Sequence, residues 1–200
     1  MSKAWFYGSQ WVLLQISRLF WFLRARGRKH IPAEGPTILA SNHASFLDPL
    51  FVGGPLPRTV RFVARSTLAE VPLVGWWMHR VGTVFVDRGA PAHTSLKMMV
   101  DVLKSGQAMI VFPEGSRTRD GGLGPFKPGI RVLVKKSGAA VVPVGIRGSF
   151  HAFPPGRRFP RLFRRCSVTY GAPMTAEEVL ADGGLEVLRR RVAELSGQSS

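Results

Sequence analysis

The sequence predicts an α/β fold: a mixed, largely parallel sheet with flanking helices, preceded by an N-terminal amphipathic helix that associates with membranes. Short apolar runs alternate with segments of helical spacing from Pro36 onward, which is typical of strands joined by helical crossovers. The 200 residues are 45% hydrophobic and 20% charged, a composition that supports one packed core and argues against disorder. We therefore expect two units: a membrane-associating helix with a basic cluster over residues 1–30, and one domain over residues 31–200.

The strands of this sheet are expected at the short apolar runs, which are Pro36–Ala40, Val60–Ala64, Thr83–Asp87, Ala108–Phe112, Ala140–Ile146 and Ser167–Gly171. The helices are expected where apolar residues recur three and four apart, at Asp48–Val52, Ala92–Lys104, Ile130–Lys136 and Ala176–Leu195. One long irregular segment, Phe153–Arg165, is rich in proline, glycine and arginine. A functional loop and a flexible surface loop both fit that segment.

The segment Trp5–Leu23 is apolar over nineteen residues and carries one charge, Arg18. A transmembrane helix needs about 20 apolar residues, so spanning is borderline and attachment to the membrane interface is favoured. Its tryptophans suit the headgroup region, and the basic cluster Arg24–Lys29 follows where anionic lipid would lie. A cleavable signal peptide fits poorly, because the basic cluster follows the apolar stretch. A helix that packs on its own domain is the remaining alternative.

The charge balance points to an anionic partner. Twenty-eight Lys and Arg against twelve Asp and Glu give a net charge of +16, and residues 1–30 and 121–176 contain no acidic residue. Nucleic acid, anionic lipid and phosphorylated substrates are the candidates. The basic stretches lack interleaved aromatic residues and any zinc-finger or RNP-like pattern, so with the N-terminal helix they favour a membrane over nucleic acid. The single cysteine, Cys166, excludes an internal disulfide and a cysteine-based zinc cluster.

Asn42-His43-Ala44-Ser45-Phe46-Leu47-Asp48 follows directly on a predicted buried strand, where α/β folds place reactive groups. Histidine is suited to take and return a proton near neutral pH, and a carboxylate on Nδ1 would fix its tautomer. His43 and Asp48 are too far apart for one straight helical face. A turn after His43 that leads into a helix near Asp48 would bring the two together. A buried capping or core pair is the alternative for such residues.

A second block, Phe112-Pro113-Glu114-Gly115-Ser116-Arg117-Thr118, also follows a strand. Gly115 permits close backbone approach, and Arg117 offers a planar fork to a phosphate. Ser116 lacks the flanking glycines of a nucleophile elbow, and no other serine has such a context. A His/Asp pair without its own nucleophile indicates that a substrate hydroxyl takes that role.

Two weaker blocks complete the pattern, and the four together resemble the glycerolipid acyltransferase family typified by 1-acylglycerol-3-phosphate acyltransferases. The family's N-H-x-x-x-x-D block is matched by Asn42, His43 and Asp48, and its F-P-E-G-T/S-R block by Phe112 through Arg117. Its other two blocks are matched at Gly82, Phe85 and Arg88, and at Val142, Pro143 and Ile146. The likeness covers about Pro36 to Gly148, with serine at position 116 where threonine is commoner.

The resemblance implies acyl transfer from a thioester, acyl-CoA or acyl-carrier protein, to the hydroxyl of a lysophospholipid acceptor. By the same resemblance His43 would be the general base, oriented by Asp48. The acceptor-binding residues would be Arg88, Glu114, Gly115, Ser116 and Arg117, with the two arginines on the phosphate. Arg117 could instead pair with Glu114 and only hold the loop. No cofactor and no metal are implied, and the expected location is the cytoplasmic face of the inner or plasma membrane.

Two other functions stay open at this point. One is the same chemistry on a different lysolipid, such as a lyso-aminolipid. The other is a basic protein that binds membranes or nucleic acid without catalysis, against which the intact His43/Asp48 and Glu114/Arg117 blocks count.

Overall fold

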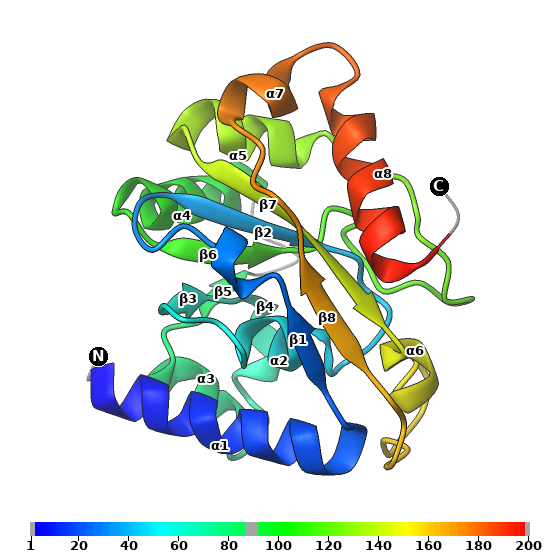
Figure 1. The fold of residues 1–200 in the computed structure, drawn as a ribbon. Helices are drawn as coiled ribbons and strands as arrows, with labels where there is room; N and C mark the ends of the chain where they lie inside the picture. The colour runs from blue at the N-terminus through cyan, green and yellow to red at the C-terminus, as the bar shows by residue number, and fades with distance from the viewer. Residues whose placement is uncertain (1–2, 87–91, 199–200) are drawn as a thin grey trace.

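The computed structural model of the chain describes residues 3–86 and 92–198, and a six-stranded sheet runs through its centre (Figure 1). The strands of this sheet are β1 (Arg24–Arg26), β2 (Thr37–Ser41), β3 (Val60–Arg61), β6 (Ala108–Val111), β7 (Ala140–Arg147) and β8 (Ser167–Tyr170). Their order is β1-β8-β7-β2-β6-β3, and every neighbouring pair is parallel except β7 with β8. A separate parallel pair is formed by β4 (Val63–Arg65) and β5 (Val84–Val86).

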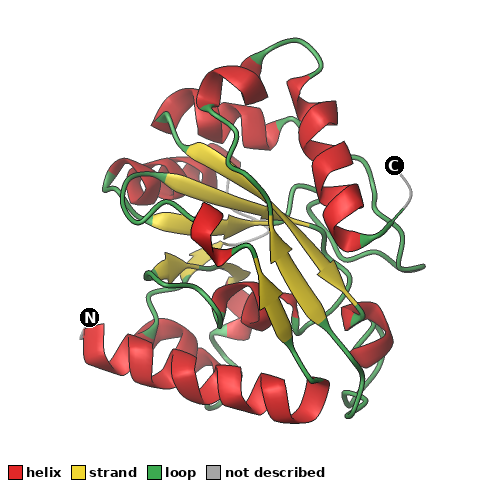
Figure 2. Ribbon diagram, in the orientation of Figure 1, coloured by secondary structure: helices red, strands yellow, loops and turns green. Residues whose placement is uncertain are grey.

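Helices cover both faces of the large sheet (Figure 2). They are α1 (Lys3–Trp21), α2 (Asp48–Gly53), α3 (Val74–Arg80), α4 (Ala92–Lys104), α5 (Gly129–Ser137), α6 (Ser149–Ala152), α7 (Ala176–Leu180) and α8 (Gly184–Ser196), with short 3-10 turns η1 (Arg28–His30) and η2 (Ser66–Leu68). The mixed, largely parallel sheet with flanking helices and an N-terminal helix confirms the predicted fold class.

Alternation along the central strands produces two cores, because successive side chains of a strand point to opposite faces. Leu39 of β2 and Val142 of β7 belong to the core shared with α1 and α2. Ile38 of β2 and Val141 of β7 belong to the core shared with α4, α5 and α8. All five residues of β2 are buried because both faces of the strand are covered. Polar and apolar residues therefore do not alternate along its sequence.

The structure corrects two of the predicted elements. The strand predicted at Val60–Ala64 is divided, because the chain leaves β6 at Phe62, whose carbonyl accepts a hydrogen bond from Val84 N at 2.8 Å. The single helix predicted at Ala176–Leu195 is broken between α7 and α8. Gly183 there has φ +70°, and a Cβ on Gly184 would lie 2.2 Å from a backbone carbonyl oxygen of α7. Helix α3 and the short strand β1 had no predicted counterpart.

Helix α1 packs one side on α2 and leaves the other exposed. Phe6, Ser17 and Trp21 are buried, and the Gln10 amide donates to Gly53 O at 2.6 Å. The opposite side carries exposed apolar residues, with Leu19 64% exposed. The alternative of a helix that packs on its own domain therefore describes only one face of α1. Among the described residues, none of the helices combines the length and the hydropathy that crossing a bilayer requires.

Close packing of β7 against α8 gives a stability prediction. A Cβ built on Gly145 would lie 2.3 Å from Leu195 C and from Ser196 N, both backbone atoms that cannot rotate away. We expect Gly145→Ala to force the two elements apart, at a cost of about 1–3 kcal/mol or more and roughly 2–4 °C in melting temperature for each kcal/mol. Differential scanning calorimetry measures the change. Gly129→Ala is the matched control, since nothing lies within 4 Å of a Cβ there, and an equal loss in both variants would contradict the packing argument.

Candidate active site

The candidate site lies where β2 and β6 end together, beside the parallel strand β7, which continues to Arg147. Ala40 of β2 is in register with Val111 of β6, and Ser41 of β2 with Val144 of β7. The segments that follow these strands therefore leave the sheet at the same edge, the usual place for a site in an α/β fold. Asn42, directly after β2, fastens this edge, because its side chain accepts a hydrogen bond from Ile146 N at 2.8 Å and donates one to Ile146 O at 3.0 Å.

His43 and Asp48 form a hydrogen-bonded pair at this edge. His43 Nδ1 lies 3.0 Å from Asp48 Oδ2, and Asp48 is the first residue of α2. The predicted turn between them is present, with Phe46 and Leu47 in the turn. Asp48 is fully buried, and its Oδ2 also accepts hydrogen bonds from Ala44 N at 2.6 Å and Ser45 N at 2.7 Å.

This arrangement sets the chemistry of the imidazole. An ionised carboxylate only accepts hydrogen bonds, so Nδ1 of His43 carries its proton and Nε2 keeps a lone pair for a substrate. The ring of Phe112 stacks on the imidazole, with the ring centroids 3.9 Å apart and the planes at 15°. With Asp48 at its edge and Phe112 on its face, the ring has a fixed orientation, while its side chain remains 18% exposed.

Glu114 connects the loop that follows β2 with the loop that follows β6. Its Oε1 accepts a hydrogen bond from His43 N at 2.7 Å, and its Oε2 accepts one from Gly124 N at 3.0 Å. Burial raises the pKa of the Glu114 carboxyl above its ordinary value, against the lowering effect of these two hydrogen bonds. Both carboxylate oxygens thus hold backbone groups of the protein, a positioning role that the sequence pattern did not indicate.

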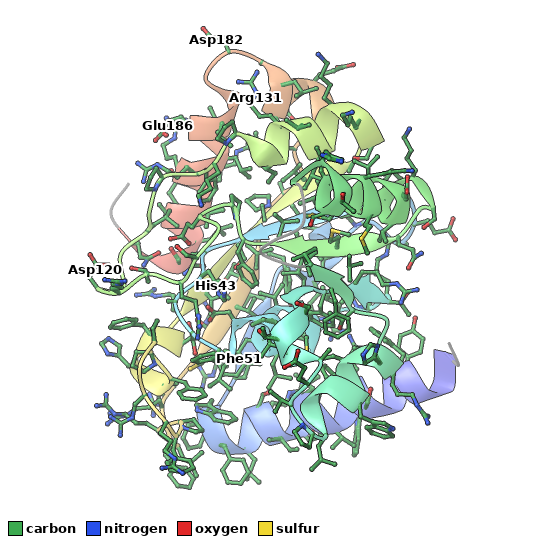
Figure 3. All side chains as sticks on the ribbon, turned by 180° about the vertical axis from the view of Figure 1, so that it is seen from behind. His43, Phe51, Asp120, Arg131, Asp182 and Glu186 are labelled. Atoms are coloured by element: carbon green, nitrogen blue, oxygen red, sulfur yellow. The ribbon has the colours of Figure 1, made fainter. Side chains whose placement is uncertain are left out.

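Beside Glu114 the loop borders an open cavity of about 420 Å³, a size typical of sites for small organic ligands. Glu114, Ser116, Arg117 and Lys127 are among its lining residues. Gly115 has φ +75°, and a Cβ there would lie 2.6 Å from Lys127 Nζ, so glycine is required both by the backbone and by the lysine. Asp120 also lines this cavity. In the view from behind (Figure 3), Asp120 lies at the edge of the molecule, whereas His43 lies inside its outline.

Arg117 lies on the same side of the sheet as the dyad. Its Cζ is 3.3 Å from the centroid of the Phe46 ring, and the next residue, Thr118, donates its N–H to His43 O at 2.9 Å. The structure thus brings five of the predicted site residues, His43, Asp48, Glu114, Gly115 and Arg117, around one edge. Ser116 is exposed on the cavity wall. Arg88 lies outside the described residues.

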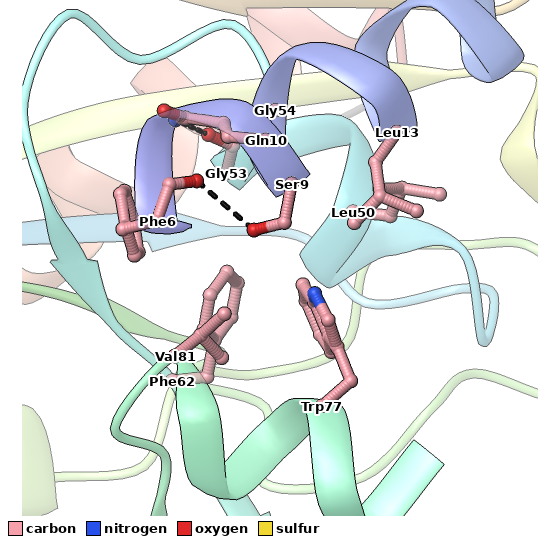
Figure 4. Close-up of a pocket in the computed structure, with 10 residues that line it drawn as sticks. All are labelled: Phe6, Ser9, Gln10, Leu13, Leu50, Gly53, Gly54, Phe62, Trp77 and Val81. Carbon is pink, nitrogen blue, oxygen red and sulfur yellow. Dashed lines mark hydrogen bonds between the residues drawn. The ribbon is translucent and has the colours of Figure 1, made fainter. Parts of the chain in front are cut away.

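A second, smaller cavity is lined mainly by apolar groups (Figure 4). It lies between α1, α2 and α3 and has a volume of about 20 Å³, room for little more than one water molecule. Phe6, Phe62 and Trp77 are among its walls, and Ser9 there donates its hydroxyl to Phe6 O at 3.0 Å. Of these two cavities in the described part of the chain, the one beside Glu114 has the volume and the charged groups for a ligand.

With this geometry established, comparison with known proteins defines the class. The model of the acyltransferase family matches residues 22–147, more than half of the chain, and the chain belongs to that family. The predicted resemblance to glycerolipid acyltransferases is thereby confirmed.

Three relatives within this family are named for one activity. A chloroplastic 1-acyl-sn-glycerol-3-phosphate acyltransferase of Arabidopsis thaliana is 34% identical over 140 residues, which cover 68% of this chain and 39% of the relative. A Bacillus subtilis protein named for the same activity is 26% identical over 127 residues, 63% of each chain. The crystal structure of the 1-acyl-sn-glycerophosphate acyltransferase of Thermotoga maritima superposes with a TM-score of 0.80 at 28% identity, covering 97% of this chain and 81% of that one. The chain spans about two fifths of the length of the plant relative.

The bracing role of Glu114 is testable by Glu114→Gln. The amide keeps one acceptor oxygen and turns an NH₂ group toward a backbone N–H, so one charge-assisted hydrogen bond is lost, worth about 1.5–3 kcal/mol. We expect a lower melting temperature and a lower kcat, since His43 is one of the two residues held. Calorimetry and steady-state kinetics measure the two effects. A variant with unchanged stability and only a raised acceptor KM would instead assign Glu114 to the acceptor.

Proposed function

We propose that the protein is a membrane-associated O-acyltransferase that moves a fatty acyl group from a thioester to the free hydroxyl of a lysophospholipid. The acceptor we propose is 1-acylglycerol-3-phosphate, which gives phosphatidic acid. The observation that carries this proposal is the hydrogen-bonded His43–Asp48 pair at the edge of the sheet. The Arg117 guanidinium lies beside it, against Phe46 of the loop that joins His43 to Asp48. Membership of the acyltransferase family supports the reaction class, and the names of the relatives support the acceptor.

The proposed reaction uses the imidazole as a proton carrier. His43 Nε2 takes the proton of the acceptor hydroxyl, and the oxygen attacks the thioester carbonyl carbon to form a tetrahedral intermediate. The C–S bond then breaks, the ester remains on the acceptor, and the imidazolium gives its proton to the leaving thiolate. A free thiol leaves and the neutral imidazole is restored. Asp48 stabilises the imidazolium that forms between the two steps.

A nucleophile of the protein is not needed in this scheme. Burial raises the pKa of the Cys166 thiol to about 12, so it stays protonated near neutral pH. The Ser45 hydroxyl is engaged in structure, donating to Phe153 O at 2.9 Å and accepting from Leu47 N at 3.1 Å. The thioester is already an activated acyl group, so we propose no cofactor or metal, with acyl-CoA or acyl-carrier protein as the co-substrate.

The remaining acceptor-binding residues follow the family pattern. We propose that Arg117 and Arg88 bind the acceptor phosphate, and that Gly115 and Ser116 shape the wall of the cavity beside it. Glu114 contributes by holding that wall to the dyad loop, through its bonds to His43 and Gly124.

The experiment that tests the function is an assay of the purified protein with a panel of lysolipids and both thioester donors, read by mass spectrometry. Phosphatidic acid formed from 1-acylglycerol-3-phosphate supports the proposal. Product from a different lysolipid alone would support the same chemistry with another acceptor. No product from any pair would favour the basic binding protein without catalysis.

His43→Ala should remove the activity while the fold persists. Loss of a general base costs about 10²–10⁴-fold in kcat. The ring is partly exposed, so the melting temperature should change little, which calorimetry and circular dichroism can verify. A variant that keeps more than about half of the activity would take His43 out of the mechanism.

Association with a membrane is the second part of the proposal, and α1 supports it. Its outward side presents large apolar residues to solvent: Trp11, Val12, Ile16 and Leu19. The arginine-rich loop that follows α6 is bonded to the end of this helix, since Phe163 N donates to Phe20 O at 2.6 Å and Trp21 Nε1 to Arg161 O at 2.9 Å (Figure 1).

Apolar and basic side chains are mixed on that loop. Phe159 and Phe163 are 67% and 66% exposed, and the Phe163 ring lies 6.3 Å from that of Phe22. The exposed arginines around them are Arg157, Arg158, Arg161, Arg164 and Arg165. Contrary to what we expected of the basic stretches, aromatic residues are interleaved with arginines here, and such a mixture suits an anionic lipid interface. We propose contact with the cytoplasmic face of the inner or plasma membrane, whose anionic lipids attract basic segments.

A double variant tests this surface without touching the core. Leu19→Ser with Phe163→Ser removes two exposed apolar side chains, and each fully buried one would contribute about 1.5–3 kcal/mol to lipid binding. We expect at least about a tenfold weaker affinity for phosphatidylglycerol vesicles in a sedimentation assay. Val132→Ser, at an exposed position on α5, is the matched control. If the double variant and the control bind alike, the anchor lies elsewhere.

A further inference from the structure

The geometry points to Phe46 as a positioning residue that holds the Arg117 guanidinium in place to receive the acceptor phosphate. Phe46 stands between His43 and Asp48 in the chain, at a position where the block N-H-x-x-x-x-D requires no particular residue. The inference rests on the proposed function, in which Arg117 binds that phosphate, and it adds a determinant of acceptor specificity.

The contact between the two side chains is a flat stack. Arg117 Cζ lies 3.3 Å from the centroid of the Phe46 ring. At that separation a guanidinium turned edge-on would bring its nitrogen atoms closer to the ring than van der Waals contact allows, so the two planes lie nearly parallel. The ring then covers one face of the guanidinium and leaves its N–H donors in the guanidinium plane, the plane in which a paired hydrogen bond to phosphate forms.

Phe46 itself is held rigidly on both sides. The carboxylate of Asp48 binds Ser45 N, and the Ser45 hydroxyl accepts from Leu47 N while it donates to Phe153 O. The Phe153 ring packs 5.1 Å from the Phe46 ring. Phe46 is nevertheless 47% exposed, so a large apolar side chain stands at the surface of the site without contributing to a core. Its contact with Arg117 accounts for an aromatic residue there.

Each of the two loops places an aromatic ring against a functional side chain of the other loop. Phe46, from the loop that carries His43, lies against Arg117, and Phe112, from the loop that carries Arg117, stacks on His43. Moving one loop relative to the other would break both contacts. The base and the guanidinium therefore keep a constant separation. Such a pair selects acceptors by the spacing between their hydroxyl and their phosphate, which in the proposed acceptor lie on adjacent carbons.

Four variants test the inference: Phe46→Leu, Phe46→Tyr, Arg117→Gln and the double variant Phe46→Leu/Arg117→Gln. Leucine keeps apolar bulk but has no π face, so Phe46→Leu should raise the KM for 1-acylglycerol-3-phosphate by about 3- to 30-fold while kcat stays within about twofold. Tyrosine keeps the ring and can point its hydroxyl to solvent, so Phe46→Tyr should restore a KM close to that of the wild type. In the Arg117→Gln background, Phe46→Leu should have no further effect on KM, because the two residues act as one unit.

Each contrary result overturns the inference. A loss of kcat without a change in KM, a failure of tyrosine to rescue, or the same rise in KM with and without Arg117 would each make Phe46 a structural residue of the turn. Melting temperatures of all four variants separate unfolding from misplacement. If Arg117→Gln leaves KM unchanged, the phosphate-binding role of Arg117 fails and the inference with it. If Arg117→Gln raises KM and Phe46→Leu does not, only the inference fails.

Discussion

The buried carboxylate of Asp48 is the group on which the geometry of the site depends. Burying a charged group is costly unless hydrogen bonds replace its water, and here one oxygen accepts three of them, from Ala44 N, Ser45 N and the ring of His43. The first two close the turn that leads into α2. The third fixes the tautomer and the direction of the imidazole. One carboxylate oxygen thus both shapes the loop and orients the base.

Glu114 repeats this device on the neighbouring loop. Its carboxylate is also buried and also binds backbone N–H groups, from His43 and Gly124. Parallel pairing of β2 and β6 brings the two loops to the same edge of the sheet, and Glu114 then sets their separation. In this arrangement Asp48 orients the side chain of His43, while Glu114 holds its backbone. In the proposed function, chemistry and acceptor binding belong to different side chains, on two loops that Glu114 joins.

The sequence was sufficient for the central strands and the dyad, since both depend on local patterns. Buried strands such as β2 and β7 are continuous apolar runs, and α4 has a clear helical period. The break between α7 and α8 was not predicted, because one helix was assigned from the apolar spacing on both sides of it. The pair Gly183-Gly184 was the signal that could have revealed it. The division of the strand at Phe62 depends on pairing with a distant segment, which no local pattern records.

The site was predicted as a set of residues but not as an arrangement. The blocks identified His43 and Glu114, yet spacing alone could not show that the Glu114 carboxylate binds the backbone of His43. The sequence did not indicate a role for Phe46, because the role of an aromatic residue at a variable position of a turn depends on its neighbour in space. That neighbour, Arg117, lies about seventy residues away in the chain, and only the parallel register of β2 and β6 brings it near.

The proposed membrane surface and the site are joined through Phe153. This residue begins the loop that carries Phe159 and Phe163, and its carbonyl accepts the hydroxyl of Ser45 while its ring packs on Phe46. At its other end the loop is bonded to the end of α1, through Phe163 N and Phe20 O. A lysophospholipid that leaves the bilayer at this surface would therefore meet the dyad loop first.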